Sequence, residues 1–155
     1  MDIVLVNEKN WPLYLQLVQY YEAEFSAITQ KKPNAQGLFE LDVQPGPEVN
    51  GYLLLIDGLP AGLAAIKTIQ THQYEVCEFY IIPSFRQQGL GRHFAHGIWK
   101  SSPGEWQVKQ IQGAAYATLF WRKVINDFSP ADSYEDQYMD AYWGQVTRQT
   151  FHVVS

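Results

Sequence analysis

One segment of this sequence constrains the fold more than any other. Residues 75–82 (EVCEFYII) form an apolar and aromatic run typical of a buried strand, and Pro83 ends it. A loop with Gly89 and Gly91 follows, and a helical pattern then continues through about Trp99. A glycine loop that opens a helix suits an anion, because free backbone N–H groups and the positive end of the helix dipole converge there. The segment therefore predicts a strand, an anion-binding loop and a helix in succession.

The spacing of the glycines excludes two common phosphate-binding motifs. A dinucleotide fingerprint, G-x-G-x-x-G, requires a third glycine at position 94, where Phe94 stands. A P-loop requires Gly-Lys followed by Ser or Thr, but Gly91 is followed by Arg92-His93. The pattern that remains is R-Q-Q-G-L-G over residues 86–91.

Hydrophobic patterning along the rest of the chain predicts a mixture of strands and helices. Asp57-Gly58 between two apolar runs indicates a hairpin. We expect one α/β domain over residues 1–155. The predicted strands are Ile3–Val6, Tyr52–Ile56, Ala61–Lys67, Glu75–Ile82, Trp106–Ile111 and Thr147–Val154. The predicted helices run from an Asn10 N-cap to about Phe25, from the glycine loop to about Trp99, and over Ala114–Ile125. Residues 26–50 are predicted to form a long irregular stretch.

Charge and composition exclude several classes of protein. The net charge of −5 argues against non-specific nucleic-acid binding, which depends on clustered basic residues. The single cysteine, Cys77, excludes an internal disulfide framework, and His93 and His96 have no third ligand in view, so we expect no metal site. No apolar run is long enough to span a bilayer, and the first residues do not resemble a signal peptide. We expect a cytoplasmic protein.

The segment EFYIIPSFRQQGLGRHF resembles the central motif of the GNAT superfamily of acyl-CoA-dependent N-acetyltransferases. The resemblance covers the strand, the loop and the helix, over about 25 residues, and Ala117–Lys123 is similar to the family's A-x-x-F-Y-x-K helix. The first 50 and the last 30 residues carry no such motif. The resemblance implies a mixed, mostly antiparallel central sheet with a splay and with helices on both faces.

The resemblance also implies where acetyl-CoA would lie. The backbone of the strand end would pair with the pantetheine arm, and an amide near Ile81 or Ile82 would polarise the thioester carbonyl. The N–H groups of Gln87 through Arg92 would hold the pyrophosphate. The cofactor-binding residues predicted in this way are Tyr80, Ile81, Ile82, Arg86, Gln87, Gln88, Gly89, Leu90, Gly91, Arg92 and Trp121.

Two carboxylates of the same strand are candidates for the general base, Glu78 first and Glu75 second. They are three residues apart, so in a regular strand they face opposite sides unless a bulge intervenes. The alternative for Glu78 is a buried or edge carboxylate in an ion pair. Glu22 and Glu24 have two explanations as well, solvated charge or an acidic lip facing the substrate.

The general acid is not assigned by the sequence. The position at which the family often carries a tyrosine is Trp121, and an indole N–H is not a usable acid near neutral pH. The family's downstream helix often starts with an asparagine, and Ala114 occupies that position here. Tyr116, Tyr134 and Tyr138 are substitutes that the sequence does not place.

These observations predict an N-acyltransferase that moves an acetyl group from acetyl-CoA to a primary amine by direct attack in a ternary complex. The acceptor would be a small amine or a peptide amine, with a slight preference for cations. A second reading is a non-catalytic CoA-binding sensor, which Ala114 and Trp121 favour. The aromatic C-terminus, with Tyr142 and Trp143, is compatible with a homodimer.

Overall fold

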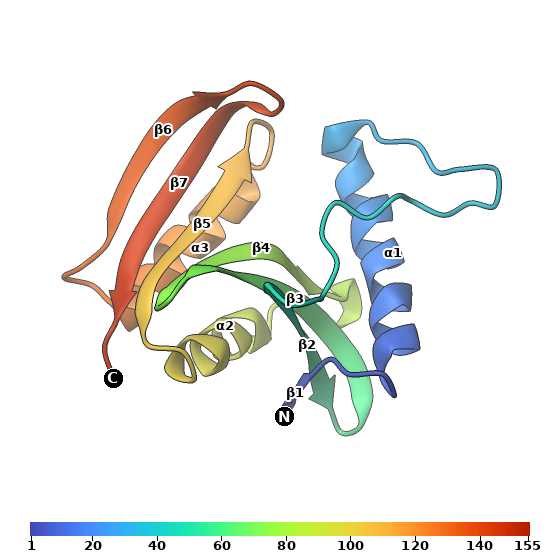
Figure 1. Cartoon of the computed structure of the whole chain (residues 1–155), viewed down its shortest axis with the longest axis horizontal. Coiled ribbons are helices and arrows are strands. Elements are labelled where there is room, and N and C mark those ends of the chain that lie inside the picture. Colours follow the sequence, from blue (N-terminus) through green and yellow to red (C-terminus); the bar gives the residue numbers. More distant parts are fainter.

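A computed structural model describes all 155 residues as one seven-stranded sheet with three α-helices (Figure 1). The strand order is β1-β2-β3-β4-β5-β7-β6. The elements are β1 (Asp2–Leu5), α1 (Trp11–Thr29), β2 (Val49–Ile56), β3 (Leu59–Gln70), β4 (Gln73–Ile81), a 3₁₀ turn (Pro83–Phe85), α2 (Leu90–Lys100), β5 (Gly104–Ile111), α3 (Ala115–Phe128), β6 (Tyr134–Asp140) and β7 (Gly144–Val153).

All neighbouring strands of the sheet are antiparallel except β4 and β5. Those two run parallel and pair only over residues 73–76 and 105–108. Beyond that point they diverge, β4 towards α1 and β5 towards the β6–β7 hairpin (Figure 1). The mixed, mostly antiparallel sheet with a splay is therefore confirmed, and the opening lies at the C-terminal ends of two parallel strands.

Helix α1 covers one face of β2, β3 and β4 through a small core of Tyr14, Leu17, Val18, Leu53, Leu63 and Tyr80. It runs to Thr29, four residues beyond the predicted end. Asn10 was expected to cap it, but the Asn10 side chain makes no cap hydrogen bond. Its Nδ2 donates to Leu5 O instead (3.1 Å), and Pro12 lies in the first turn of the helix.

The predicted hairpin is present, and its turn is tighter than expected. Only Asp57 and Gly58 separate β2 from β3, and both have positive φ (51° and 79°). Two such residues match the twist of the flanking strands, which explains the Asp-Gly sequence.

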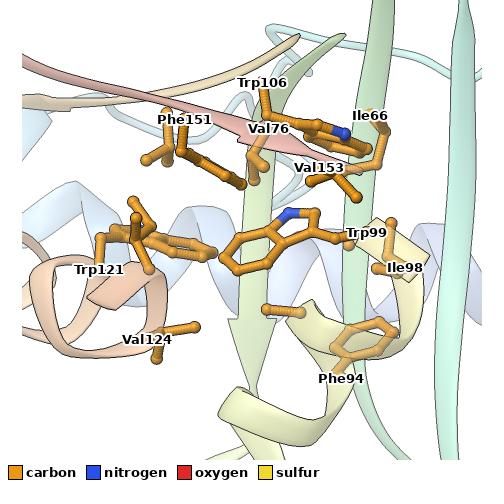
Figure 2. Close-up of a cluster of buried hydrophobic side chains, with 14 of the residues drawn as sticks. Ile66, Val76, Phe94, Ile98, Trp99, Trp106, Trp121, Val124, Phe151 and Val153 are labelled. Atoms are coloured by element: carbon orange, nitrogen blue, oxygen red, sulfur yellow. The ribbon is translucent and has the colours of Figure 1, made fainter. Parts of the chain in front are cut away.

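Helices α2 and α3 cover the opposite face of the sheet, so helices lie on both faces as predicted (Figure 1). Trp99 of α2 lies at the centre of this larger core (Figure 2). Its ring centroid is 4.5 Å from that of Phe151, 6.1 Å from that of Trp121 and 6.4 Å from that of Trp106. These contacts join both helices to β5 and β7.

Strand β6 was not predicted from the sequence. It reads YEDQYMD, with three acidic residues, and it lies at the edge of the sheet, paired only with β7. An edge strand with one neighbour tolerates this polarity, and charges there disfavour pairing with another chain. Of the C-terminal aromatics, Phe151 lies in the core, whereas Tyr134 and Tyr142 are exposed. None of the helices combines the length and apolarity needed to span a membrane.

Candidate active site

The site is built around a bulge in β4. Ala65 of β3 pairs with Glu78, and the next residue, Ile66, pairs with Val76, so Cys77 is the extra residue. Val76 and Phe79 both pack in the core beneath α2 and α3, although an odd interval separates them. The bulge thus reverses the alternation of the strand just where β4 leaves β5.

The backbone at the end of β4 is only partly free. The N–H of Ile82 donates to Ala61 O (2.8 Å) within the sheet, so it is not available to polarise a carbonyl, contrary to one of the two alternatives from the sequence. Strand alternation turns the peptide groups of Tyr80 towards β3 as well. The same alternation directs the N–H of Ile81 into the opening between β4 and β5.

The glycine loop has the geometry of an anion cradle. Gln87 and Gly89 have positive φ (66° and 73°), and α2 begins directly after Gly89 with no side-chain cap. The first helical hydrogen bond runs from the N–H of His93 to Gly89 O, so the N–H groups of Leu90, Gly91 and Arg92 have no partner within the helix. These are donors that the sequence predicted for the pyrophosphate.

The two glycines of the loop have different physical roles. A Cβ on Gly89 would meet only the His93 ring, at 3.8 Å, so its surroundings are open and its positive φ is what favours glycine. A Cβ on Gly91 would lie 3.0 Å from the Phe120 ring. Gly91 therefore allows α2 and α3 to approach each other.

The structure places Trp121 in the hydrophobic core, where it is 5% exposed (Figure 2). Its ring packs against Phe79, Trp99 and Phe120. This position favours packing over the cofactor contact predicted for it.

Other residues of α3 have the exposure that a cofactor wall requires. Tyr116 is 82% exposed and Leu119 is also exposed, next to the Phe120 that touches Gly91. Leu119 was not predicted as a site residue from the sequence. The one sequence feature that could have indicated it is the spacing of Tyr116, Leu119 and Phe120, which places the three residues on one side of a helix.

Glu78 is the most perturbed carboxylate of the site. It is 3% exposed, and its Oε1 has no hydrogen-bond partner. Burial, together with the negative charges of Glu22 and Asp42, raises the pKa of Glu78 to about 8, and the charge of Lys31 opposes this shift. A carboxylate with that pKa can accept a proton near neutral pH.

An ion-pair cluster lies beside Glu78 on the α1 side of the sheet. Lys31 Nζ lies 2.5 Å from Glu22 Oε2 and 3.1 Å from Asp42 Oδ2, and it donates to Glu40 O (2.9 Å). Glu22 is 3% exposed, so the solvated-charge explanation is wrong for this residue. Because Lys31 and Asp42 belong to the predicted irregular stretch, the cluster fastens that stretch to α1.

Glu75, the second candidate base, is held by partners on β5. Its Oε1 lies 2.8 Å from Lys109 Nζ and accepts a hydrogen bond from Gln107 Nε2 (2.8 Å). The neighbouring Cys77 is not a nucleophile at neutral pH, because burial and the charge of Glu75 raise the pKa of its thiol to about 12.

The three tyrosines considered as general acids lie in different surroundings. Tyr116 and Tyr134 are exposed on α3 and β6. Tyr138 is half-buried, and Arg148 lies over its ring at 4.8 Å. No group of three or more His, Cys, Asp or Glu side chains is arranged to hold a metal ion.

Comparison with known proteins gives a family and a fold. The sequence model of the acetyltransferase (GNAT) family matches residues 14–97. No curated protein sequence matches this chain significantly.

Solved structures with a similar fold include acetyltransferases with low sequence identity. The ribosomal-protein-S18-alanine N-acetyltransferase of Escherichia coli has a TM-score of 0.67 at 11% identity, covering 99% of this chain and 94% of its own. A ribosomal L7/L12 alpha-N-protein acetyltransferase in complex with coenzyme A has a TM-score of 0.68 at 14% identity, covering 97% and 93%. An acetyltransferase from Bacillus anthracis bound to acetyl coenzyme A has a TM-score of 0.54 at 13% identity, covering 69% and 64%.

Proposed function

Because this chain belongs to the acetyltransferase (GNAT) family, we propose that it transfers an acetyl group from acetyl-CoA to a primary amine. The observation that carries the proposal is Glu78, a buried carboxylate whose Oε1 has no partner, at the point where β4 diverges from β5. An ion-paired structural carboxylate would have both oxygens satisfied. Glu78 instead retains the capacity to accept a proton.

Three features support acetyl-CoA as the donor. The free N–H groups at the start of α2 suit the pyrophosphate, since they combine unpaired donors with the positive end of the helix dipole. The N–H of Ile81 is directed into the opening of the sheet, where a thioester carbonyl would receive its hydrogen bond. The exposed Tyr116 and Leu119 offer an apolar wall beside the loop.

The reaction then needs a group that accepts a proton from the attacking nitrogen and a source of a proton for the CoA thiolate. The neutral form of the acceptor amine attacks the thioester carbonyl carbon, and Glu78 accepts the proton that the nitrogen loses as the carbon–nitrogen bond forms. The N–H of Ile81 stabilises the negative charge on the carbonyl oxygen until the carbon–sulfur bond breaks. The amide product and the CoA thiolate leave, and the thiolate takes up a proton. Of the three tyrosines only Tyr138 is half-buried, and we propose it as the group that supplies this proton.

No acyl-enzyme is formed in this scheme. Cys77 is the only cysteine, and with a pKa of about 12 it remains a neutral thiol. Direct attack requires donor and acceptor to be bound together.

The charge around Glu78 favours a cationic acceptor. Glu22, Asp42 and Glu78 are three carboxylates that share one cation, Lys31, so the cluster carries an excess of negative charge once Glu78 is ionised. Small amines and peptide amines both fit this requirement.

The proposal is tested by incubating the protein with acetyl-CoA and a panel of amines. We expect thiol release that depends on the amine, and an acceptor that gains one acetyl group by mass spectrometry. Protein with acetyl-CoA alone should release no thiol above the rate without protein. If coenzyme A and acetyl-CoA bind but no amine releases thiol, the protein is a CoA-binding sensor and the proposed activity is wrong.

A further inference from the structure

Arg86, the first residue of the glycine loop, is held by an acidic residue of α1. Its Nη2 lies 2.9 Å from Glu24 Oε2 and 3.1 Å from Glu24 Oε1. Its Nε donates to Ile81 O (2.8 Å), and its guanidinium lies 5.4 Å from the Tyr80 ring centroid. The Tyr80 hydroxyl also donates to Glu24 Oε1 (3.3 Å). The guanidinium is therefore bound to β4 and α1.

These contacts differ from those of a phosphate-binding arginine. Two of the three guanidinium nitrogens are occupied by protein oxygens, and the charge is neutralised by Glu24. The backbone N–H groups at the start of α2 have no partner within the helix and are free for an anion. Arg86 thus joins the end of β4 to α1, and the backbone that follows it forms the cradle.

The backbone after Arg86 needs such an anchor. Gln87 has a positive φ (66°), a conformation that is unfavourable for a residue other than glycine. Gly89 adds a second positive φ, and no side chain caps α2. A short strained segment keeps its conformation only when both of its ends are fixed. Helix α2 fixes one end, and the contacts of Arg86 fix the other.

We propose that Glu24 is a positioning residue for the cofactor loop, acting through Arg86. This inference rests on the proposed function, because the cradle is assigned to acetyl-CoA. Glu24 holds the guanidinium against Tyr80 and Ile81, and the guanidinium holds the first residue of the loop. The loop N–H groups are then fixed in place before the pyrophosphate arrives, which lowers the cost of binding.

The same helix also contacts the acceptor side. Glu22, two residues before Glu24, binds Lys31 of the irregular stretch beside Glu78. One turn of α1 therefore contacts both the glycine loop, through Glu24, and the irregular stretch beside Glu78, through Glu22.

A double-mutant cycle between Glu24 and Arg86 tests the proposal. Binding of coenzyme A is measured by calorimetry for the wild type, Glu24→Gln, Arg86→Gln and the double variant. We expect each single change to weaken binding about two- to fivefold, the range of an exposed ion pair, and the double variant to be no weaker than Arg86→Gln. The charge exchange Glu24→Arg with Arg86→Glu should restore part of the affinity.

Glu135→Gln is the matched control. Glu135 accepts two hydrogen bonds from Arg122 (2.8 and 2.7 Å), in a partly exposed ion pair on β6 and α3. This variant loses an ion pair of the same kind, and it should bind coenzyme A as the wild type does. Equal weakening in Glu135→Gln would mean that general destabilisation causes the effect, and it would overturn the proposal.

Two further outcomes would overturn the proposal. Arg86→Gln is compared in the wild-type protein and in the Glu24→Gln variant. If it weakens binding by the same factor in both, Arg86 contacts the anion independently of Glu24. If Glu24→Gln leaves the affinity unchanged, the ion pair does not position the loop.

A second readout separates failure of this inference from failure of the proposed function. Hydrogen exchange of the amides of residues 87–92 is followed in the ligand-free protein. Faster exchange in Glu24→Gln than in Glu135→Gln supports positioning, even if coenzyme A does not bind. Equal exchange in the two variants contradicts it.

Discussion

Glu75 and Glu78 lie on the same face of β4, although they are three positions apart in the sequence. The bulge at Cys77 is the cause, since Ala65 pairs with Glu78 and Ile66 with Val76. Both carboxylates thus face the α1 side of the sheet, and their partners distinguish them. Glu75 is paired with Lys109, whereas Glu78 Oε1 has no partner. Glu78 therefore fits the general base of the proposed reaction, and Glu75 has the environment of a structural ion pair.

The buried Glu78 should make the fold less stable as the pH rises. Its pKa is about 8 in the folded protein and 4.5 as a free side chain, so between these values the folded state binds the additional proton. The free energy of unfolding then falls as the pH rises from about 4.5 to about 8, and it is not lowered further above that range. Glu78→Gln removes this slope and should be the more stable protein at pH 9, by at most about 5 kcal/mol.

Urea unfolding at pH 5, 7 and 9 measures this difference. The variant Glu75→Gln is the control, because it makes the same chemical change on the same strand and leaves Glu78 in place. It should retain the wild-type slope. A constant difference between wild type and Glu78→Gln across the three pH values would show that Glu78 does not titrate in this range.

Substitution of Gly89 should affect the cofactor more than the fold. Gly89→Val places a β-branched side chain at a φ of 73°, in the middle of the loop whose N–H groups face the anion. We expect the affinity for coenzyme A to fall at least about tenfold, because the side chain keeps the phosphates from the backbone.

Gly58→Val provides the matched control for Gly89→Val. Gly58 also has a positive φ (79°) and open space around its Cβ position, but it lies in the β2–β3 turn. Both variants should lose a similar free energy of unfolding, and only Gly89→Val should lose affinity in calorimetry. Equal affinities would place the anion elsewhere.

Trp99 should contribute more to stability than any exposed aromatic residue. It contacts Trp106, Trp121 and Phe151 in a core that joins α2 and α3 to the sheet (Figure 2). Trp99→Ala should lower the free energy of unfolding by about 3–5 kcal/mol, through lost contacts and the cavity. Tyr116→Ala, at an exposed position, should change it by less than about 0.5 kcal/mol in urea unfolding. A loss below about 1 kcal/mol for Trp99→Ala would contradict this packing.

The parts of the site that are continuous in sequence were predictable. The strand, the glycine loop and the helix of residues 75–99 depend on local patterns, and the structure places them in that order. The bulge left no such signal. Residues 79–82 are all apolar or aromatic, so the alternation that would reveal a change of face cannot be followed past Glu78.

The contacts that distinguish the site were not predictable, because they join distant segments. Arg86 and Glu24 are 62 residues apart, and nothing near either residue indicates the other. Lys31 lies in a stretch without secondary structure, so its pairing with Glu22 depends on the path of the chain. Strand β6 escaped prediction because its acidic residues suit an edge position, which only the assembled sheet defines.

The most direct test of the account is the pH dependence of kcat/KM for acetyl transfer, in the wild type and in Glu78→Gln. An acceptor amine whose own pKa lies below 6 stays neutral, so the enzyme's titration is seen alone. In the wild type, kcat/KM should rise with pH up to a pKa near 8. Glu78→Gln should lose both this dependence and a factor of about 10²–10⁴ in rate, whereas Glu75→Gln should keep the dependence. The same rate and the same pH profile in Glu78→Gln would contradict the assignment of Glu78 as the general base.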